Sequence, residues 1–243
     1  SHPELNPARE RVLDALVSLC AGPEAARAAL GLGPTQLDEV GHNARLRVAP
    51  ALPASRLYAG VLYEALDLAS LPAPARRSAT RWVLVFSGLW GVLRLTDKVP
   101  PYRCPVGASL PGIGALAGHW RPVLAPALAA AAGTGPILDL RSGAYGAMWA
   151  PSGELAARTV AVRVLHERIV DGVSRRTPVS HFNKATKGRL VRDLAAAGAR
   201  PRRVAEVATA LRDLKYTVDE HEPVPGRSRV VDVVVRGTGY GVA

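Results

Sequence analysis

Apolar residues in the first eighty positions recur at helical spacing. Between residues 6 and 20 they stand three or four apart, Asn6-Pro7 can begin a helix, and Gly22 can end it. Further helices are predicted at residues 23–30, 35–46 and 59–69. The pattern therefore predicts a helical region over residues 1–80.

From residue 81 onwards the pattern mixes strands with helices. Continuous apolar runs at 82–86 and 136–140 are typical of strands in a buried sheet. Valines at 160, 162 and 164 alternate as in a half-buried strand, and a turn at Asp171-Gly172 allows residues 177–182 to return as the second strand of a hairpin. The remaining expected elements are a helix from Asn183 to Ala197, a helix from Pro201 to Leu211 and a strand at 229–235.

These elements follow no regular strand-helix-strand repeat, and neither an internal repeat nor a long linker divides the chain. With 48% hydrophobic residues in 243 positions, the chain can bury a core, which excludes global disorder. We therefore expect a single mixed α/β domain of the α+β kind over residues 1–243, helical at 1–80 and mixed at 81–243, in which a mixed sheet is flanked by helices.

Charge and cysteine content narrow the function classes. There are 31 Lys and Arg residues against 20 Asp and Glu residues, so the net charge is +11, which favours a polyanionic partner. The apolar runs are far shorter than the roughly 18 residues that span a bilayer. Cys20 and Cys104 cannot form a disulfide framework, and the six histidines lack metal-ligand spacing. We expect a cytoplasmic protein without a transmembrane helix, metal or other cofactor.

The densest basic stretch runs from residue 175 to residue 203, where a single acidic residue, Asp193, faces nine basic ones. These are Arg175, Arg176, Lys184, Lys187, Arg189, Arg192, Arg200, Arg202 and Arg203. Two interpretations stay open on charge alone: a solvated helical face, or a surface that binds phosphate groups.

A glycine-containing turn follows the strand at 82–86. Ser87, Gly88 and Gly91 can form a tight turn whose backbone N–H groups face an anion, although a strand-to-helix corner requires the same glycines for steric reasons. Basic and aromatic residues follow within a few positions: Trp90, Arg94, Lys98, Tyr102 and Arg103. Such interleaving suits phosphate contacts and base stacking.

Residues 110–117 resemble the hairpin of a helix-hairpin-helix motif. In that motif the turn, here with Gly112 and Gly114, offers backbone N–H groups to a DNA phosphate. The preceding residues 104–109 contain Pro105 and Gly107 and do not predict a first helix. An ordinary turn that opens the following helix is the alternative.

The start of the helix predicted at Asn183 is a third candidate anion site. Lys184 and Lys187 stand three residues apart and share one helix face, Gly188 permits close approach, and Arg189 adds a further charge. The alternative is a solvated basic helix start. The segment is not a phosphate-binding loop of the P-loop kind, because the required glycine spacing is missing.

Nucleophilic catalysis has weaker support. Ser87, Ser142 and Cys104 are candidate nucleophiles, but none lies in a Gly-x-Ser-x-Gly elbow or beside an evident base. An enzyme acting on a nucleotide or nucleobase is the alternative to a binding protein. It would use Ser142 together with Asp97 or Tyr145 if a pocket brings them together.

Taken together, the segments 87–94 and 101–103, with Asp97, Gly107 and Trp120, resemble the central signature of the YaaA family of peroxide-stress proteins. Further similar segments are 137–142 with Tyr145, 180–190 and 214–216, so that the resemblance covers residues 55–235. Two features depart from the family pattern. The chain begins in a helical region, so the family's first strand is expected to be missing, and Leu95 stands where the family commonly has Pro.

The resemblance implies a cytoplasmic bacterial protein with a positively charged cleft. It implies DNA binding and protection of DNA during oxidative stress, partly through lower intracellular iron, and by itself it implies no enzyme activity. We expect segments 87–103 and 184–192 to form the cleft, which would bind the backbone of duplex or branched DNA without sequence preference. No membrane partner is expected, and protein partners stay open.

Overall fold

The computed structural model describes residues 1–170 and 172–236, and it describes only the backbone of Ser180 and His181. These residues form two compact units. The first comprises 1–58, 80–131 and 141–150, and the second comprises 59–79, 132–140 and the remainder from Pro151. The expectation of one domain over residues 1–243 stays a prediction.

The first unit consists of helices and three short strand pairs. Its helices are η1 (Pro3–Leu5), α1 (Asn6–Leu19), α2 (Pro23–Leu30), η2 (Pro34–Gln36), α3 (Asp38–Ala44), α4 (Ala54–Leu57), α7 (Leu116–Ala131) and α8 (Gly143–Gly146). Its strands are β1 (Leu52–Pro53), β2 (Leu84–Ser87), β3 (Gly91–Arg94), β4 (Lys98–Val99), β5 (Ser109–Leu110) and β6 (Gly114–Ala115). All pairs, β1 with β4, β2 with β3 and β5 with β6, are antiparallel.

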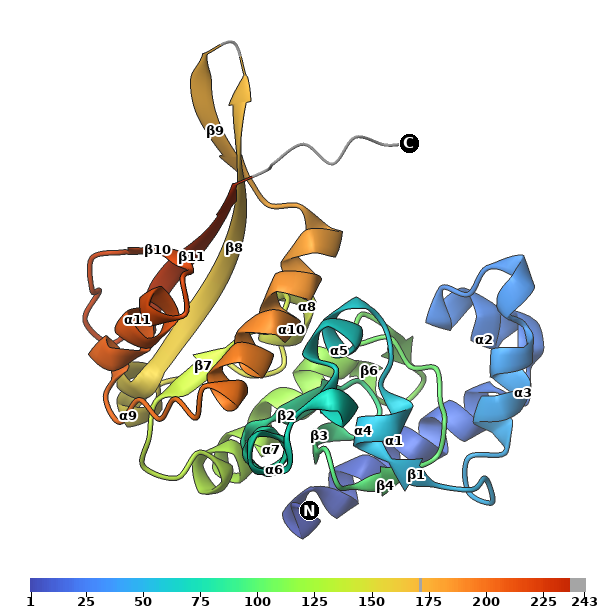
Figure 1. The fold of residues 1–243 in the computed structure, drawn as a ribbon. Coiled ribbons are helices and arrows are strands. Elements are labelled where there is room, and N and C mark those ends of the chain that lie inside the picture. The colour runs from blue at the N-terminus through green and yellow to red at the C-terminus, as the bar shows by residue number, and fades with distance from the viewer. Residues whose placement is uncertain (171, 237–243) are drawn as a thin grey trace. The chain divides into compact units, whose positions relative to one another are not determined.

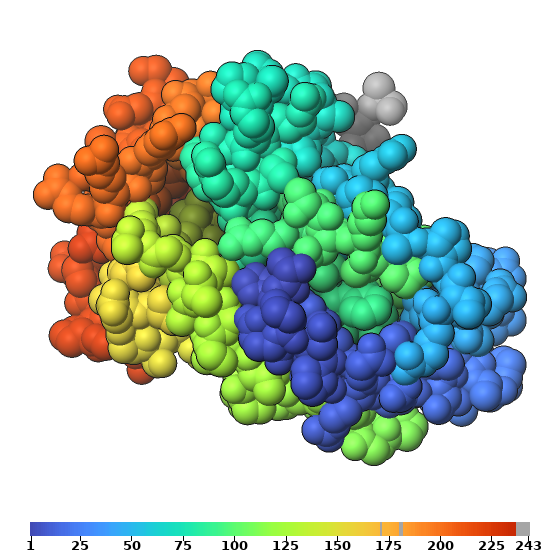
Figure 2. Space-filling model, turned by 90° about the horizontal axis from the view of Figure 1, so that it is seen from below, coloured from blue at the N-terminus to red at the C-terminus, as the bar shows by residue number. Residues whose placement is uncertain are grey.

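Helix α1 is the expected amphipathic helix. It buries Val12, Leu13 and Leu16, and its neighbours include α3, α7 and β5. Figure 2 shows the outer side of this N-terminal segment, coloured dark blue, next to the green segment that contains α7. The first helix thus packs beside β5, the strand that precedes the loop with Gly112.

The second unit is built on a mixed five-stranded sheet (Figure 1). Its helices are α5 (Val61–Leu66), η3 (Leu68–Ser70), α6 (Ala73–Trp82, whose last three residues belong to the first unit), α9 (Gly153–Arg158), α10 (Ser180–Ala196) and α11 (Val204–Asp213). Its strands are β7 (Ile137–Asp139), β8 (Thr159–Val170), β9 (Val173–Thr177), β10 (Thr217–Glu220) and β11 (Arg229–Arg236). The strand order is β10-β11-β8-β7, and β9 pairs with β8.

Strands β7, β8 and β11 are parallel, while β9 and β10 run antiparallel to their neighbours. The alternating valines of β8 face the core with Val231 and Val233 of β11, and Leu190 and Leu211 pack there from α10 and α11. Burial of each such side chain contributes about 1.5 to 3 kcal/mol. This arrangement confirms the expected mixed α+β fold with a mixed sheet flanked by helices.

Some element boundaries differ from the sequence predictions. The return strand is β9 at Val173–Thr177, not residues 177–182, because Val170 pairs directly with Val173 across Gly172, whose φ is +76°. The next helix begins at Ser180, so Asn183 does not cap it. Trp82 ends α6, and the strand that follows, β2, pairs among the described strands with β3 alone, in the first unit.

Candidate functional site

The β2–β3 hairpin ends in a chain of hydroxyl groups. Ser87 Oγ lies 2.5 Å from the hydroxyl of Tyr102, which lies 2.6 Å from the hydroxyl of Tyr58. Ser87 Oγ also accepts a hydrogen bond of 2.9 Å from the backbone N–H of Trp90 and so holds the turn. The structure thus brings together two residues that the sequence singles out, Ser87 and Tyr102, and adds Tyr58.

Protonation limits what this chain of hydroxyls can do. Burial raises the pKa of Tyr102 well above its ordinary value, and burial also raises the pKa of Tyr58 and of Tyr145. These phenols are protonated at neutral pH and cannot act as bases towards Ser87. Burial raises the pKa of Cys104 to about 12, so its thiol is not a ready nucleophile.

Gly88 and Gly91 are required by packing. A Cβ atom at Gly88 would lie 2.5 Å from the carbonyl oxygen of Cys104, and one at Gly91 would lie 2.7 Å from the ring of Trp120. Gly91 also has a φ of +71°, and the Trp120 Nε1–H donates to the carbonyl of Gly88 at 2.8 Å. The steric interpretation of these glycines therefore has direct support, because an indole covers the turn.

Arg9 is a structural residue of this hairpin that the sequence analysis missed. Its guanidinium is buried and donates to the carbonyls of Trp90 at 3.1 Å and Val92 at 2.9 Å. Burial lowers the pKa of Arg9, although neighbouring carboxylates oppose the shift. The signal was present in the sequence, because Arg9 stands between Leu5 and Val12 at positions where α1 is otherwise apolar.

The basic residues of the same unit differ in their surroundings. Arg94 donates from Nη1 to the carbonyl of Arg81 at 2.7 Å, whereas Lys98 and the side chain of Arg103 are exposed. The backbone of Arg103 is fixed by the fully buried Asn43, whose Oδ1 accepts from the Arg103 N–H at 2.9 Å and whose Nδ2 donates to its carbonyl at 2.8 Å. Arg103 thus faces solvent from a backbone that Asn43 holds, and Lys98 faces solvent from β4.

Gly112 lies in the loop between β5 and β6, and Gly114 is the first residue of β6. Both have positive φ, +72° and +75°, and a Cβ atom at either would meet open space. The segment 100–108 before the loop contains no helix, so the first helix of a helix-hairpin-helix motif does not form here. The expectation of that motif is corrected to an ordinary strand hairpin that leads into α7, because Pro105 and Gly107 disfavour a helix.

The structure does not join the three residues considered for catalysis. Ser142 is exposed at the start of α8, and the partly buried Tyr145 accepts a 3.2 Å hydrogen bond at its carbonyl from Arg141. Asp97 accepts from the Arg94 N–H at 2.8 Å and closes the turn after β3. Within the described residues no hydrogen bond links any two of the three.

In the second unit, Lys187 points back towards the sheet. Its Nζ donates to the carbonyl of Leu140 at 2.9 Å, just after β7. Burial lowers the pKa of Lys187, while the nearby Asp139 raises it. Gly188 is in close contact with α5, where a Cβ atom would collide with the carbonyl of Leu62. Gly188 therefore serves helix packing.

Lys184 and Arg189 are exposed on α10 and form no ion pair within residues 1–170 and 172–236. An α-helix turns about 100° per residue, so Lys187 and Arg189 lie on nearly opposite sides of α10. Burial and Asp193 raise the pKa of Tyr216, and the nearby charge of Arg189 opposes part of that rise. The three cations of this segment do not converge on one anion site.

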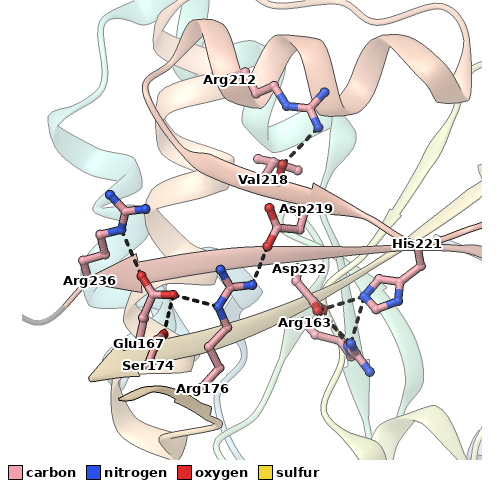
Figure 3. Close-up of polar contacts among 10 residues, drawn as sticks. All are labelled: Arg163, Glu167, Ser174, Arg176, Arg212, Val218, Asp219, His221, Asp232 and Arg236. Carbon is pink, nitrogen blue, oxygen red and sulfur yellow. Dashed lines mark hydrogen bonds and ion pairs between the residues drawn. The ribbon is translucent and has the colours of Figure 1, made fainter. Parts of the chain in front are cut away.

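A further charged cluster lies on the outer face of the sheet, and Figure 3 shows its contacts. Arg163 donates from Nε and Nη2 to the two carboxylate oxygens of Asp232 at 2.6 and 2.7 Å. His221 Nε2 lies 2.8 Å from the same carboxylate and borders a shallow pocket of about 350 Å³ with Arg227 and Ser228. Asp232, a charged residue inside the apolar run 230–235, was the signal in the sequence for this cluster.

No group of three or more His, Cys, Asp or Glu side chains among the described residues could hold a metal ion. No described helix is long and apolar enough to cross a membrane.

A family model described as peroxide stress protein YaaA matches residues 1–222. This chain belongs to the YaaA family. A UPF0246 protein of Streptomyces coelicolor is 55% identical over 237 residues, which cover 97% of this chain and 89% of that relative. A UPF0246 protein of Corynebacterium efficiens is 35% identical over 240 residues, with 97% of this chain and 90% of the relative covered.

Membership of the YaaA family confirms the resemblance carried by segments 87–94, 101–103 and 180–190. The matched range includes every candidate binding residue from Ser87 to Arg189. The family description associates its members with peroxide stress. In this YaaA-family chain, the segment 87–103 and the helix α10 belong to different units.

Proposed function

We propose that this YaaA-family protein binds the phosphate backbone of duplex or branched DNA without sequence preference, in the cytoplasm and as part of the response to peroxide stress. The support comes from exposed cations without counter-charges on α10 and beside it. Lys184 and Arg189 are exposed and have no ion pair in the described part of the chain. The same holds for Arg175, Arg200 and Arg202.

Other basic residues of the stretch 175–203 are already neutralised. Arg176 pairs with Glu167 and Asp219, and Arg192 lies 3.6 Å from Asp67. Arg203 pairs with Glu206. Binding of DNA releases counterions when protein cations replace them at the phosphates, so the cations without internal partners are the ones that can contribute.

An enzyme acting on a nucleotide is the alternative function. The hydroxyl chain of Ser87, Tyr102 and Tyr58 is the feature that favours it, because a nucleophilic serine lies within hydrogen-bond reach of a second titratable side chain. The raised pKa values of the two tyrosines count against it, because a nucleophilic serine needs a base. Non-enzymatic binding of DNA is therefore the function we favour.

Titration of labelled DNA at several salt concentrations tests the proposal. Duplex and branched DNA of different sequences should bind with similar affinity, and log affinity should fall steeply and linearly with log salt. The double variant Lys184→Gln and Arg189→Gln should bind more weakly, with a salt slope lower by about two. An affinity that does not depend on salt, or no binding at low salt, would contradict DNA binding.

Arg27→Gln with Arg47→Gln is the matched control, because it removes the same charge from residues that already pair with Glu24, Glu10 and Asp14. Equal losses in both double variants would mean that net charge alone drives binding. If the protein turned over a nucleotide, and the Lys184→Gln, Arg189→Gln variant lowered that turnover without changing DNA affinity, the enzyme would be the favoured function.

A further inference from the structure

The hairpin of β8 and β9 continues past the sheet as a two-stranded ribbon (Figure 1). In the described residues β11 accompanies β8 only as far as Glu167, whereas β9 pairs with β8 from His166 to Val170. Each of the five residues of β9 is exposed. The two faces of this ribbon differ in their chemistry.

On the outer face of the ribbon, the charged side chains are paired with opposite charges. Glu167 accepts from Arg176 Nε at 2.9 Å, from Ser174 Oγ at 3.0 Å and from Arg236 Nε at 3.0 Å, while Arg176 also donates to Asp219 at 2.5 Å (Figure 3). Every charged side chain drawn on this face of the ribbon has an opposite charge beside it. The charges of this face therefore need no partner outside the protein, although Ile169, on the same face, is 70% exposed.

The opposite face extends the side of the sheet that buries Val160, Val162 and Val164. Side chains alternate along a strand and directly paired residues share a face, so this face carries three cross-strand pairs. We call it the Arg168 face, and its pairs are His166 with Thr177, Arg168 with Arg175 and Val170 with Val173. His166 is buried beside the ring of Phe182 in α10, whereas the pairs beyond it are exposed.

Two features of the Arg168 face do not serve the fold. Arg168 and Arg175 stand directly opposite each other, and neither forms an ion pair among the described side chains. A like-charge pair across two strands is destabilising. Val170 and Val173 are 42% and 59% exposed at the end of the ribbon, where they bury little surface within the protein.

The major groove of duplex DNA offers negative charge to the paired arginines and apolar surface to the exposed valines. Two strands lie about 4.8 Å apart, and the major groove of DNA, about 12 Å wide, admits a two-stranded ribbon. Phosphates on the groove walls would neutralise the paired arginines, and the valines would meet sugar atoms or thymine methyl groups. The charge excludes an ordinary apolar protein surface as the occupant.

We propose that the Arg168 face enters the major groove of duplex DNA, with Arg168 and Arg175 on phosphates and Val170 and Val173 against the groove. This proposal rests on the proposed DNA binding and adds a second contact to that of α10. It assigns the ribbon the role of a DNA-binding arm.

The test uses the full chain and a short labelled duplex. Arg168→Ser with Arg175→Ser should lower affinity about tenfold or more and should reduce the salt slope by about two. Arg176→Ser with Arg236→Ser removes the same charge from the other face of the ribbon and should retain most of the affinity. Val170→Ser with Val173→Ser should weaken binding several-fold without changing the salt slope, because no charge is lost.

Methylation of guanine N7 reports on the groove itself. Wild-type protein should protect guanines in the major groove, and the Arg168→Ser, Arg175→Ser variant should protect them less. Arg168→Lys with Arg175→Lys should restore the salt slope, which separates lost contacts from a misfolded ribbon. Circular dichroism checks that each variant is folded.

Different failures have different meanings. If the wild type does not bind duplex DNA, the proposed function fails and the arm with it. If the wild type binds but the two arginine pairs give equal losses, or guanine N7 stays reactive, the arm proposal alone is wrong. If the Arg168 face variants lose binding to vesicles of anionic lipid and keep DNA binding, a membrane surface replaces DNA as the partner of this face.

Discussion

Two basic segments, residues 87–103 in the first unit and residues 184–203 in the second, use their polar groups in opposite ways. In the first, Ser87, Tyr102 and the hairpin carbonyls are bonded to other parts of the same unit, and Arg9 and Trp120 hold them. In the second, Lys184, Arg189, Arg200 and Arg202 are exposed and form no ion pair in the described part of the chain. The comparison suggests that the glycine turn mainly stabilises the fold, while the helix supplies charge for binding.

The largest effect should come from Gly91→Ala. The new methyl group would collide with the ring of Trp120, and an alanine at a φ of +71° is strained. We expect a loss of about 4 kcal/mol in the free energy of unfolding, measured by urea denaturation. Gly112→Ala is the control, because its φ is +72° but the space around it is open, and it should lose only about 1 to 2 kcal/mol.

Arg9→Met should have the next largest effect. It keeps the apolar stem but leaves the carbonyls of Trp90 and Val92 without their buried donor, so we expect a loss of about 2 to 3 kcal/mol in urea denaturation. The exposed neighbour Arg11→Met should change stability by less than about 0.5 kcal/mol. Similar values for both variants would show that the hairpin does not depend on Arg9.

Tyr102→Phe should destabilise the protein by about 1 to 2 kcal/mol, because it removes the hydroxyl between Ser87 and Tyr58. Tyr58→Phe should have a smaller effect, because Tyr102 keeps its bond to Ser87. Urea denaturation of the two variants measures the difference. If Tyr58→Phe lost as much as Tyr102→Phe, the hydroxyl chain would not be held through Tyr102.

The same tyrosines predict a pH dependence. Burial raises the pKa of Tyr102 and Tyr58 in the folded state above the unfolded value of about 10. Their contribution to stability is therefore fully present below about pH 10 and is lost as pH rises through the folded values. Unfolding at a series of alkaline pH values should show this decline, and the double variant Tyr58→Phe, Tyr102→Phe should show a weaker one.

The sequence predicted the sheet better than the site. Alternating valines in β8 and the apolar run of β11 identify their strands, because burial on one or both faces leaves a periodic signal. The apolar spacing around Arg9 marks that residue as buried, but no pattern links Arg9 to Val92, because the two stand 83 residues apart. Equally, the sequence could place Lys187 and Arg189 in one helix, but only the structure shows that Lys187 bonds Leu140 while Arg189 lies towards Tyr216.

The smallest change in stability should come from Lys184→Gln with Arg189→Gln. Both side chains are exposed and lack ion pairs in the described residues, so their loss should change the free energy of unfolding by less than about 0.5 kcal/mol. DNA affinity should nevertheless fall, whereas Gly112→Ala should lower stability and leave affinity unchanged. This double dissociation, measured by denaturation and DNA titration on the same samples, separates the role of α10 from that of the β5–β6 loop. If Gly112→Ala lowered DNA affinity as much as the α10 variant does, the β5–β6 loop would belong to the binding surface. If the α10 variant lost stability, the charges of Lys184 and Arg189 would contribute to the fold.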